Sequence, residues 1–255
     1  MTQEFAKLNH KECIAEKTYL LIIESSNIAQ YGRAGQFVNI RIDSQGSNPL
    51  LRRPYTISNV SDSSFEIIVQ VVGRGSQLLA EKNCGEMLDI IGPLGNAFRT
   101  GGDFDTACLV GGGVGIAPFP FLTRMLISAG KNVETFAGFK SKAQIVTREL
   151  NNIHIATDDG SAGFHGNVVE LLHHYFDEHS IVKPKIFSCG PMPMLRALTL
   201  FATERRICCE VSLESEMACG VGLCQGCVVE RNGNGGKFAL VCKEGPNFFS
   251  DEIKL

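Results

Sequence analysis

Two patterns of hydrophobic and polar residues divide the chain near residue 101. In the first part, apolar and polar side chains alternate over residues 38–42, and apolar stretches recur at 65–72 and 87–91 between clusters of Gly, Asn, Asp and Ser. Alternation with a period of two is typical of half-buried β-strands. Short strands at this spacing predict a small antiparallel β-barrel over residues 1–101.

The second part alternates apolar runs with segments of helical spacing. The expected helices cover residues 116–128, 168–176 and 192–205, and the expected strands cover 107–110, 133–137, 153–157 and 185–188. Strands and helices in alternation imply a parallel sheet with helices on its faces. We therefore predict an α/β domain over residues 102–208, followed by a segment, 209–255, that is too short to build a core of its own.

The composition is that of an ordinary globular protein and argues against several classes of partner. The chain has 255 residues, a hydrophobic content of 44% and a net charge of −3, enough for two domains and an appendage. No basic stripe indicates nucleic acid, and no apolar run reaches the length of about 18 residues that spans a bilayer. The N-terminus leads into charged residues, so we expect no signal peptide and a cytoplasmic, reducing location.

Four of the ten cysteines have the spacing C-x4-C-x2-C-x14-C, and three glycines lie among the first three of them. This spacing is typical of a plant-type [2Fe–2S] cluster, whose two irons need four thiolates. We therefore predict that a cluster carrying single electrons is bound by Cys219, Cys224, Cys227 and Cys242. The cluster would also supply stabilisation that a short segment lacks.

A structural zinc site and a disulfide framework are the alternatives for these cysteines. Zinc modules usually present two C-x2-4-C pairs, and only Cys224 and Cys227 form one. A chain of this length does not need disulfide staples. The cysteines without ligand spacing are expected to be mostly small buried hydrophobes: Cys13, Cys84, Cys108, Cys208 and Cys209.

A glycine-rich turn follows the first strand of the α/β part, at residues 111–118. Its backbone N–H groups could approach a pyrophosphate at a helix N-terminus, although a tight turn with close packing explains the glycines as well. The glycines that carry this prediction are Gly111, Gly112, Gly113 and Gly115.

Two later strand ends would complete a nicotinamide site, because ligands of open α/β sheets bind beyond the carboxyl ends of the strands. Cys189, Gly190 and Pro191 follow one strand, and Cys189 is either a neighbour of the nicotinamide or simply a small buried residue. Asp158 follows another strand and would favour ribose hydroxyls, hence NAD(H), unless it belongs simply to an exposed acidic turn. Lys140 and Lys142 would instead suit a phosphate.

The β-rich part carries a candidate flavin motif. Arg53 could neutralise a flavin pyrophosphate, Tyr55 could stack on a flavin ring, and Thr56 could hydrogen-bond near the reactive flavin nitrogen. Gly75 and Ser76 open an expected helix at 77–81, a second N-terminus for phosphate. The alternative for Arg53 is a surface salt bridge.

In this order, the motifs R-P-Y-T, G-G-G-V-G-I-A-P and C-G-P resemble those of the ferredoxin–NADP reductase superfamily. The cysteine segment, with Ser212-Leu213-Glu214 before it and Lys243-Glu244-Gly245-Pro246 after it, is similar to the electron-transfer subunits of type B dihydroorotate dehydrogenase. The resemblance covers essentially the whole chain. It departs at Tyr55, where the family usually has an aliphatic residue, and at Asn247-Phe248, where the family usually has a valine and a phenylalanine.

The resemblance implies FAD, a [2Fe–2S] cluster and NAD(H) as substrate. It also implies an FMN-containing catalytic partner that oxidises dihydroorotate, in a heterotetramer of two copies of each subunit that serves pyrimidine (UMP) biosynthesis. The cysteines named above would be the cluster ligands. The implied flavin contacts are Arg53, Pro54, Tyr55, Thr56, Ile68, Val69, Gln70, Gly75 and Ser76.

No catalytic residue is assigned; Thr56 and Cys189 are the candidates. We find no third domain for a pyrimidine site, so a permanent partner is expected, and it would contact the cluster face. Phe248 and Phe249 are either contacts for that partner or residues packed beneath the C-terminal segment. Two alternatives stay open: a related reductase subunit serving another acceptor, such as a hydrogenase or a ferredoxin-like carrier, and a non-enzymatic sensor that holds flavin and cluster without turnover.

Overall fold

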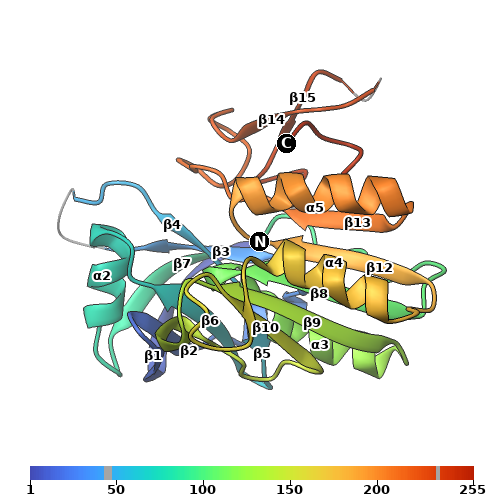
Figure 1. Cartoon of the computed structure of the whole chain (residues 1–255). Helices are drawn as coiled ribbons and strands as arrows, with labels where there is room; N and C mark the ends of the chain where they lie inside the picture. Colours follow the sequence, from blue (N-terminus) through green and yellow to red (C-terminus); the bar gives the residue numbers. More distant parts are fainter. Residues whose placement is uncertain (43–47, 234–235) are drawn as a thin grey trace.

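Two seven-stranded sheets form the framework of the protein in the computed structural model, which describes residues 1–42, 48–233 and 236–255 (Figure 1). The first sheet is antiparallel throughout, with the order β4-β3-β7-β1-β2-β6-β5. Its strands are β1 (Thr2–Ala15), β2 (Thr18–Glu24), β3 (Phe37–Arg41), β4 (Arg53–Thr56), β5 (Asn59–Val60), β6 (Ser64–Gln70) and β7 (Met87–Leu94). The predicted antiparallel N-terminal architecture is confirmed, with helices α1 (Ser26–Tyr31) and α2 (Arg74–Glu81) between its strands.

Strand β3 departs from the expected half-buried pattern. Val38 and Ile40 lie in the core as predicted, but Asn39 on the opposite face is also fully buried. Phe37, on the same face as Asn39, packs in a second core that includes residues of the C-terminal segment. The polar face of the strand is therefore covered by protein at Asn39, whereas Arg41 at the end of the strand is exposed, as predicted.

The second sheet has the order β11-β10-β9-β8-β12-β13-β16, and every neighbouring pair except the last is parallel. Helix α3 (Phe119–Ser128) packs in the core that is continuous with the barrel, whereas α4 (Val168–Glu178) and α5 (Met192–Arg205) pack in the other core. Opposite faces of the sheet are thus covered, as the alternating pattern predicts. The parallel strands are β8 (Thr106–Gly112), β9 (Asn132–Phe139), β10 (Ile153–Thr157), β11 (Phe164–His165), β12 (Pro184–Cys189) and β13 (Cys208–Ser212).

The helix expected at 116–128 begins later than predicted. A 3-10 turn covers Gly113–Ile116, and α3 starts at Phe119 after Pro118. Proline is well tolerated at a helix start because it needs no intrahelical N–H bond there. The apolar spacing that predicted the helix therefore included residues 116–118, which belong to the turn before α3.

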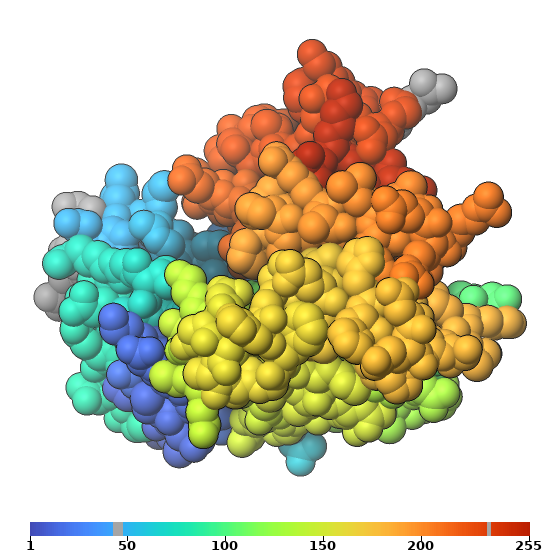
Figure 2. All heavy atoms as spheres, viewed as in Figure 1, coloured from blue at the N-terminus to red at the C-terminus, as the bar shows by residue number. Residues whose placement is uncertain are grey.

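The C-terminal segment is built onto the α/β sheet. It contains β14 (Val228–Glu230), β15 (Phe238–Leu240) and β16 (Asn247–Phe249), and β16 pairs antiparallel with β13. Strand β13 lies across the predicted boundary at 209, so the boundaries between the three parts stay a prediction. Val241, Phe248 and Ile253 share a core with α5, which explains how so short a segment is ordered; it lies over α5 at the top of Figures 1 and 2.

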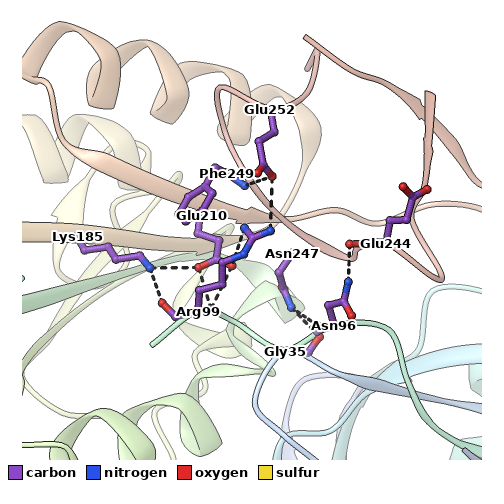
Figure 3. Close-up of polar contacts among 9 residues, drawn as sticks. All are labelled: Gly35, Asn96, Arg99, Lys185, Glu210, Glu244, Asn247, Phe249 and Glu252. Carbon is purple, nitrogen blue, oxygen red and sulfur yellow. Dashed lines mark hydrogen bonds and ion pairs between the residues drawn. The ribbon is translucent and has the colours of Figure 1, made fainter. Parts of the chain in front are cut away.

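A buried polar junction joins this segment to both domains (Figure 3). The Glu210 carboxylate is fully buried and accepts hydrogen bonds from the backbone N–H of Arg99, at 3.1 and 3.2 Å. The ammonium of Lys185 lies 3.4 Å from Glu210 and also donates to the Arg99 carbonyl. The Arg99 guanidinium lies 4.3 Å from the ring centroid of Phe249, and 3.6 Å separates it from the carboxylate of Glu252. The junction thus connects the end of the barrel to β12, β13 and the C-terminal segment.

The structure decides where two groups of side chains lie. Cys108 and Cys209 are buried as predicted, but Cys13, Cys84 and Cys208 are exposed. Phe248 is only 2% exposed, so it packs beneath the segment and does not form a docking surface. No helix among the residues described here is long and apolar enough to cross a membrane.

Candidate functional site

One cleft of about 490 Å³ is walled by the barrel, the α/β domain and the C-terminal segment. Residues of β4 and the start of α2 form the barrel side. The residues predicted from the sequence that line it are Arg53, Pro54, Tyr55, Thr56, Ile68, Gln70, Gly75, Ser76 and Cys189. The structure therefore brings the candidate flavin motif together with one predicted nicotinamide residue.

The guanidinium of Arg53 faces this cleft and is held by the chain before it. It donates to the carbonyls of Leu51 and Arg52, at 3.0 and 3.2 Å. Within the described part of the chain, no ion pair to Arg53 is found, so the surface salt bridge considered from the sequence is not seen there. Its neighbour Arg52 is the residue that forms a salt bridge, 2.6 Å from the carboxylate of Asp89.

The start of α2 forms the end of the cleft next to Arg53. The Ser76 hydroxyl accepts hydrogen bonds from the N–H groups of Val72 and Gly73, at 3.0 and 3.2 Å, and so holds the first turn. A Cβ placed on Gly75 would lie 3.4 Å from the Arg53 side chain. With Arg74 also lining the cleft, this end offers two guanidinium groups and a helix N-terminus, the features that bind a pyrophosphate.

Two side chains that line the cleft stay uncharged at neutral pH. Burial raises the pKa of Tyr55 to about 12, although the charge of Arg53 acts in the opposite direction. Burial also raises the pKa of Cys189 to about 12; the nearby Glu214 adds to this effect and a hydrogen bond with Ser212 opposes it. Cys189 is therefore a neutral, buried thiol rather than a reactive thiolate.

The glycine-rich turn after β8 and the C-G-P turn after β12 lie against each other. A Cβ on Gly115 would collide with the carbonyl of Cys189, and one on Gly190 would lie 3.0 Å from the backbone nitrogen of Gly112. Glycine is required at these positions because the two backbones approach too closely for a side chain. Val114, Ala117 and Pro118 of the first turn line the cleft.

Several predicted residues lie outside the lining of the cleft. The side chain of Val69 is fully buried in the barrel core. Asp158 is exposed at the end of β10, and its neighbour Asp159 accepts hydrogen bonds from Ser161. Gly111 and Gly112 are the last residues of β8, and the others lie in the two turns just described: Gly113, Gly115, Gly190 and Pro191.

The C-terminal segment contributes a wall of the cleft that was not predicted from the sequence. Ser212, Leu213, Glu214, Ser215 and Met217 all line the cleft. Burial raises the pKa of Glu214, the carboxylate on this side. The available signal was the position of Ser212-Leu213-Glu214 at the end of a strand, where ligands of α/β sheets bind.

The four predicted ligand cysteines lie just beyond this wall, in two pairs. Cys224 donates its backbone N–H to the Cys219 sulfur at 3.4 Å, and Cys242 does the same to the Cys227 sulfur at 3.4 Å. Within each pair the thiols also contact each other. The first pair is at the surface, with Cys224 exposed, whereas Cys227 and Cys242 are buried.

The loop prepares the Cys219 thiol for ionisation. Partial burial would raise the pKa of Cys219, but N–H groups of Cys224, Val221 and Leu223 bind its sulfur, so the pKa falls to about 6. Burial and the Cys227 thiol raise the pKa of Cys242 to about 12, and metal binding must displace that proton.

The donor set fits two bridged irons, which take two thiolates each. The two thiol pairs, Cys219 with Cys224 and Cys227 with Cys242, supply this number of ligands. The grouping of the thiols in twos therefore matches a binuclear cluster better than one tetrahedral zinc.

The comparisons with known proteins agree with this geometry. Residues 5–98 match the family described as the oxidoreductase FAD-binding domain. Residues 214–254 match the iron–sulfur cluster binding domain of dihydroorotate dehydrogenase B. The predicted cofactors, FAD and an iron–sulfur cluster, are thus confirmed at the level of the domains that bind them.

Whole-chain relatives extend the likeness. The dihydroorotate dehydrogenase B (NAD(+)) electron transfer subunit of Bacillus cereus (strain Q1) is 36% identical over 263 residues, 99% of this chain and 98% of the relative. A chain of the NADH-dependent reduced ferredoxin–NADP oxidoreductase is 31% identical with a TM-score of 0.87, over 98% of this chain and 90% of that one. Phthalate dioxygenase reductase is 16% identical with a TM-score of 0.65, over 99% and 98%, and shows the same fold. On this evidence, the chain belongs to the family of dihydroorotate dehydrogenase B electron transfer subunits.

Proposed function

We propose that the protein passes electrons between NAD(H) and a separate catalytic subunit that oxidises dihydroorotate, in pyrimidine biosynthesis. The observation that supports this most is the shared cleft. Its walls come from the barrel, from the turn after β8 and from the segment that continues to Cys219. A flavin in this cleft would have the nicotinamide turns on one side and the cysteine loop on the other.

Arg53 and Arg74 would balance the two negative charges of the FAD pyrophosphate, and the first turn of α2 would supply N–H donors. Tyr55, which stays neutral, would offer a ring face for stacking. When bound, a flavin exchanges electron pairs with a nicotinamide and single electrons with an iron–sulfur cluster. Thr56 and Cys189 remain the candidates next to the reacting atoms.

NADH is the proposed nucleotide. Backbone groups of the Gly111–Gly115 turn and of Gly190 and Pro191 would hold its pyrophosphate and nicotinamide ends. The exposed carboxylate of Asp158 would favour unmodified ribose hydroxyls over a 2′-phosphate.

Cys219, Cys224, Cys227 and Cys242 are the proposed ligands of the [2Fe–2S] cluster. Thiolate ligands must stay reduced until the cluster is assembled, so a reducing, cytoplasmic setting fits the site.

The curated relatives are named as electron transfer subunits, which supports a permanent catalytic partner. We propose that the partner carries FMN and that two copies of each subunit associate. Cys224 is exposed and Leu223 beside it is 81% exposed, so the cysteine loop is a surface that a partner can reach.

Spectroscopy of the purified protein tests the cofactors, and reconstitution tests the function. Visible absorbance and an iron content of two per chain are expected, and NADH added anaerobically should bleach the flavin. Co-expression with the catalytic subunit should then give NAD-linked oxidation of dihydroorotate. A zinc-loaded, colourless protein, or a pair of subunits with no NAD-linked turnover, would contradict the proposal.

A second function is favoured by the likeness to the reduced ferredoxin–NADP oxidoreductase chain, at 31% identity and a TM-score of 0.87. In this alternative the same cofactors serve an iron–sulfur carrier. Reduction of ferredoxin in place of orotate-coupled turnover would distinguish it from the first.

A further inference from the structure

Asn39 is a buried amide that connects the barrel to the cysteine loop. It lies on β3, where it is fully buried, and its side-chain nitrogen donates to the carbonyl of Cys219 at 3.3 Å. Cys219 is the first of the four proposed ligands. The contact therefore joins residues that are 180 positions apart in the sequence.

The loop is shaped to make this contact. Gly220 has a φ of +69°, and a Cβ on it would collide with the amide nitrogen of Asn39. Both the left-handed backbone and the close approach require glycine. The chain thus turns directly over the Asn39 amide immediately after the ligand.

Asn39 also lies next to β4, the strand that carries the candidate flavin motif and is called the flavin strand below. In the register of β3 and β4, Asn39 is opposite Pro54 of the R-P-Y-T motif, whose residues line the cleft. One side chain therefore lies between the strand that would hold the flavin and the residue that would hold an iron.

Burial of this amide is unfavourable unless it is fully hydrogen-bonded. In the part of the chain that the structure describes, the Asn39 side-chain oxygen has no hydrogen-bond donor. An unsatisfied buried oxygen is destabilising, and an apolar residue of similar size would avoid it. Violations of such local rules are expected where a residue serves a function.

We propose that Asn39 is a positioning residue that fixes Cys219, and with it the cysteine loop, at a set distance from the flavin strand. The inference rests on the proposed function, because it concerns the passage of electrons from the cleft to the cysteine loop. Asn39 itself contacts the backbone of a ligand and does not bind the cluster.

The test replaces Asn39 by leucine in the intact, cofactor-loaded protein. Asn59 is the matched control, because it is also a buried asparagine of the barrel but donates to Glu149 instead of the loop. Four quantities are measured: the electron paramagnetic resonance spectrum of the dithionite-reduced cluster, its reduction potential, the thermal midpoint, and the rates of flavin and cluster reduction by NADH.

For Asn39→Leu we expect a changed resonance spectrum and an altered cluster potential, with the rate of flavin reduction by NADH unchanged. Cluster reduction should slow by about 10- to 100-fold, the loss typical when a residue that orients a metal ligand is removed. Asn59→Leu should leave the spectrum and the potential as in the unmodified protein.

A lower thermal midpoint with an unchanged spectrum, potential and cluster rate would overturn the inference, since Asn39 would then be purely structural. If the leucine variant does not fold, Asn39→Ser, whose hydroxyl is too short to reach the Cys219 carbonyl, is measured in its place and judged by the same criteria. Failure of NADH to reduce the cluster of the unmodified protein would instead refute the proposed function, and the dithionite-reduced spectra would still decide the role of Asn39.

Discussion

The buried junction around Glu210 offers the sharpest test of how the three parts are held together. We consider Lys185→Met, which keeps most of the length of the side chain but removes its charge. Lys185 is 4% exposed and Glu210 is fully buried, so neither charge is compensated by water (Figure 3). The Lys185 ammonium also lies 4.6 Å from the ring centroid of Phe187 and 5.3 Å from that of Phe249.

Removal of one partner from a buried ion pair typically costs about 3–5 kcal/mol. The lower end applies to Lys185→Met, because Glu210 keeps two hydrogen bonds from the Arg99 N–H and a guanidinium at 3.6 Å. We therefore expect Lys185→Met to lower the free energy of unfolding by about 3 kcal/mol. In the double variant with Glu210→Gln, the loss should be smaller than the sum of the two single losses, since neither charge is left unpaired.

The dependence on pH follows from the pKa of Glu210, which burial already raises above 4.5. Loss of Lys185 raises that pKa further. A group with a raised folded-state pKa contributes stability that is present below its unfolded pKa and is lost as the pH rises through the folded value. The loss of unfolding free energy in Lys185→Met should therefore be largest at neutral pH and become smaller as the pH falls toward 4.5.

Urea denaturation, followed by the absorbance of the cofactors and by far-ultraviolet circular dichroism at fixed cofactor loading, measures these free energies. Lys183→Met is the control, because Lys183 pairs with Asp103 at 2.8 Å on the exposed surface and its loss should have no measurable effect. Strictly additive losses in the double variant, or a deficit that grows as the pH falls, would show that Lys185 and Glu210 do not act as a buried pair.

Three further predictions concern the cleft and the cysteine loop. Gly220→Ala should lower the iron content, measured by atomic absorption, because its φ is +69° and its Cβ has no space, whereas Gly226→Ala should keep the iron. Cys227→Ser should abolish cluster absorbance while FAD is retained, and Cys208→Ser should change neither. Tyr55→Phe should have the same free energy of unfolding as the unmodified protein below pH 10. Toward pH 12 it should be the more stable by about 2–3 kcal/mol, because Tyr55 ionises more readily in the unfolded state than in the folded state, where its pKa is about 12. An equal loss of unfolding free energy in Tyr55→Phe and in the unmodified protein between pH 10 and pH 12 would contradict the last prediction.

The architecture and the main chemical groups could be predicted from the order of residues alone. The change from a period of two to alternating strands and helices located both sheets, because each period reflects which side of an element faces a core. The cysteine spacing predicted the loop that the structure forms, since ligands close in sequence are placed by local backbone geometry. Strand β1 was not predicted, because it is long and mostly exposed and carries few apolar positions. Strand β2 was also not predicted, although its apolar run over Tyr19–Ile23 was a usable signal.

Contacts between distant segments were decided only by the tertiary structure. Periodicity made Asn39 a solvent-facing residue, but the C-terminal segment covers it. The same folding places Glu214 and Met217 in the wall of the cleft, buries Phe248, and adds β16 to the edge of a sheet formed by much earlier residues. A local pattern records which face of an element is apolar, but not which remote segment will cover its polar face, because that depends on how the whole chain packs.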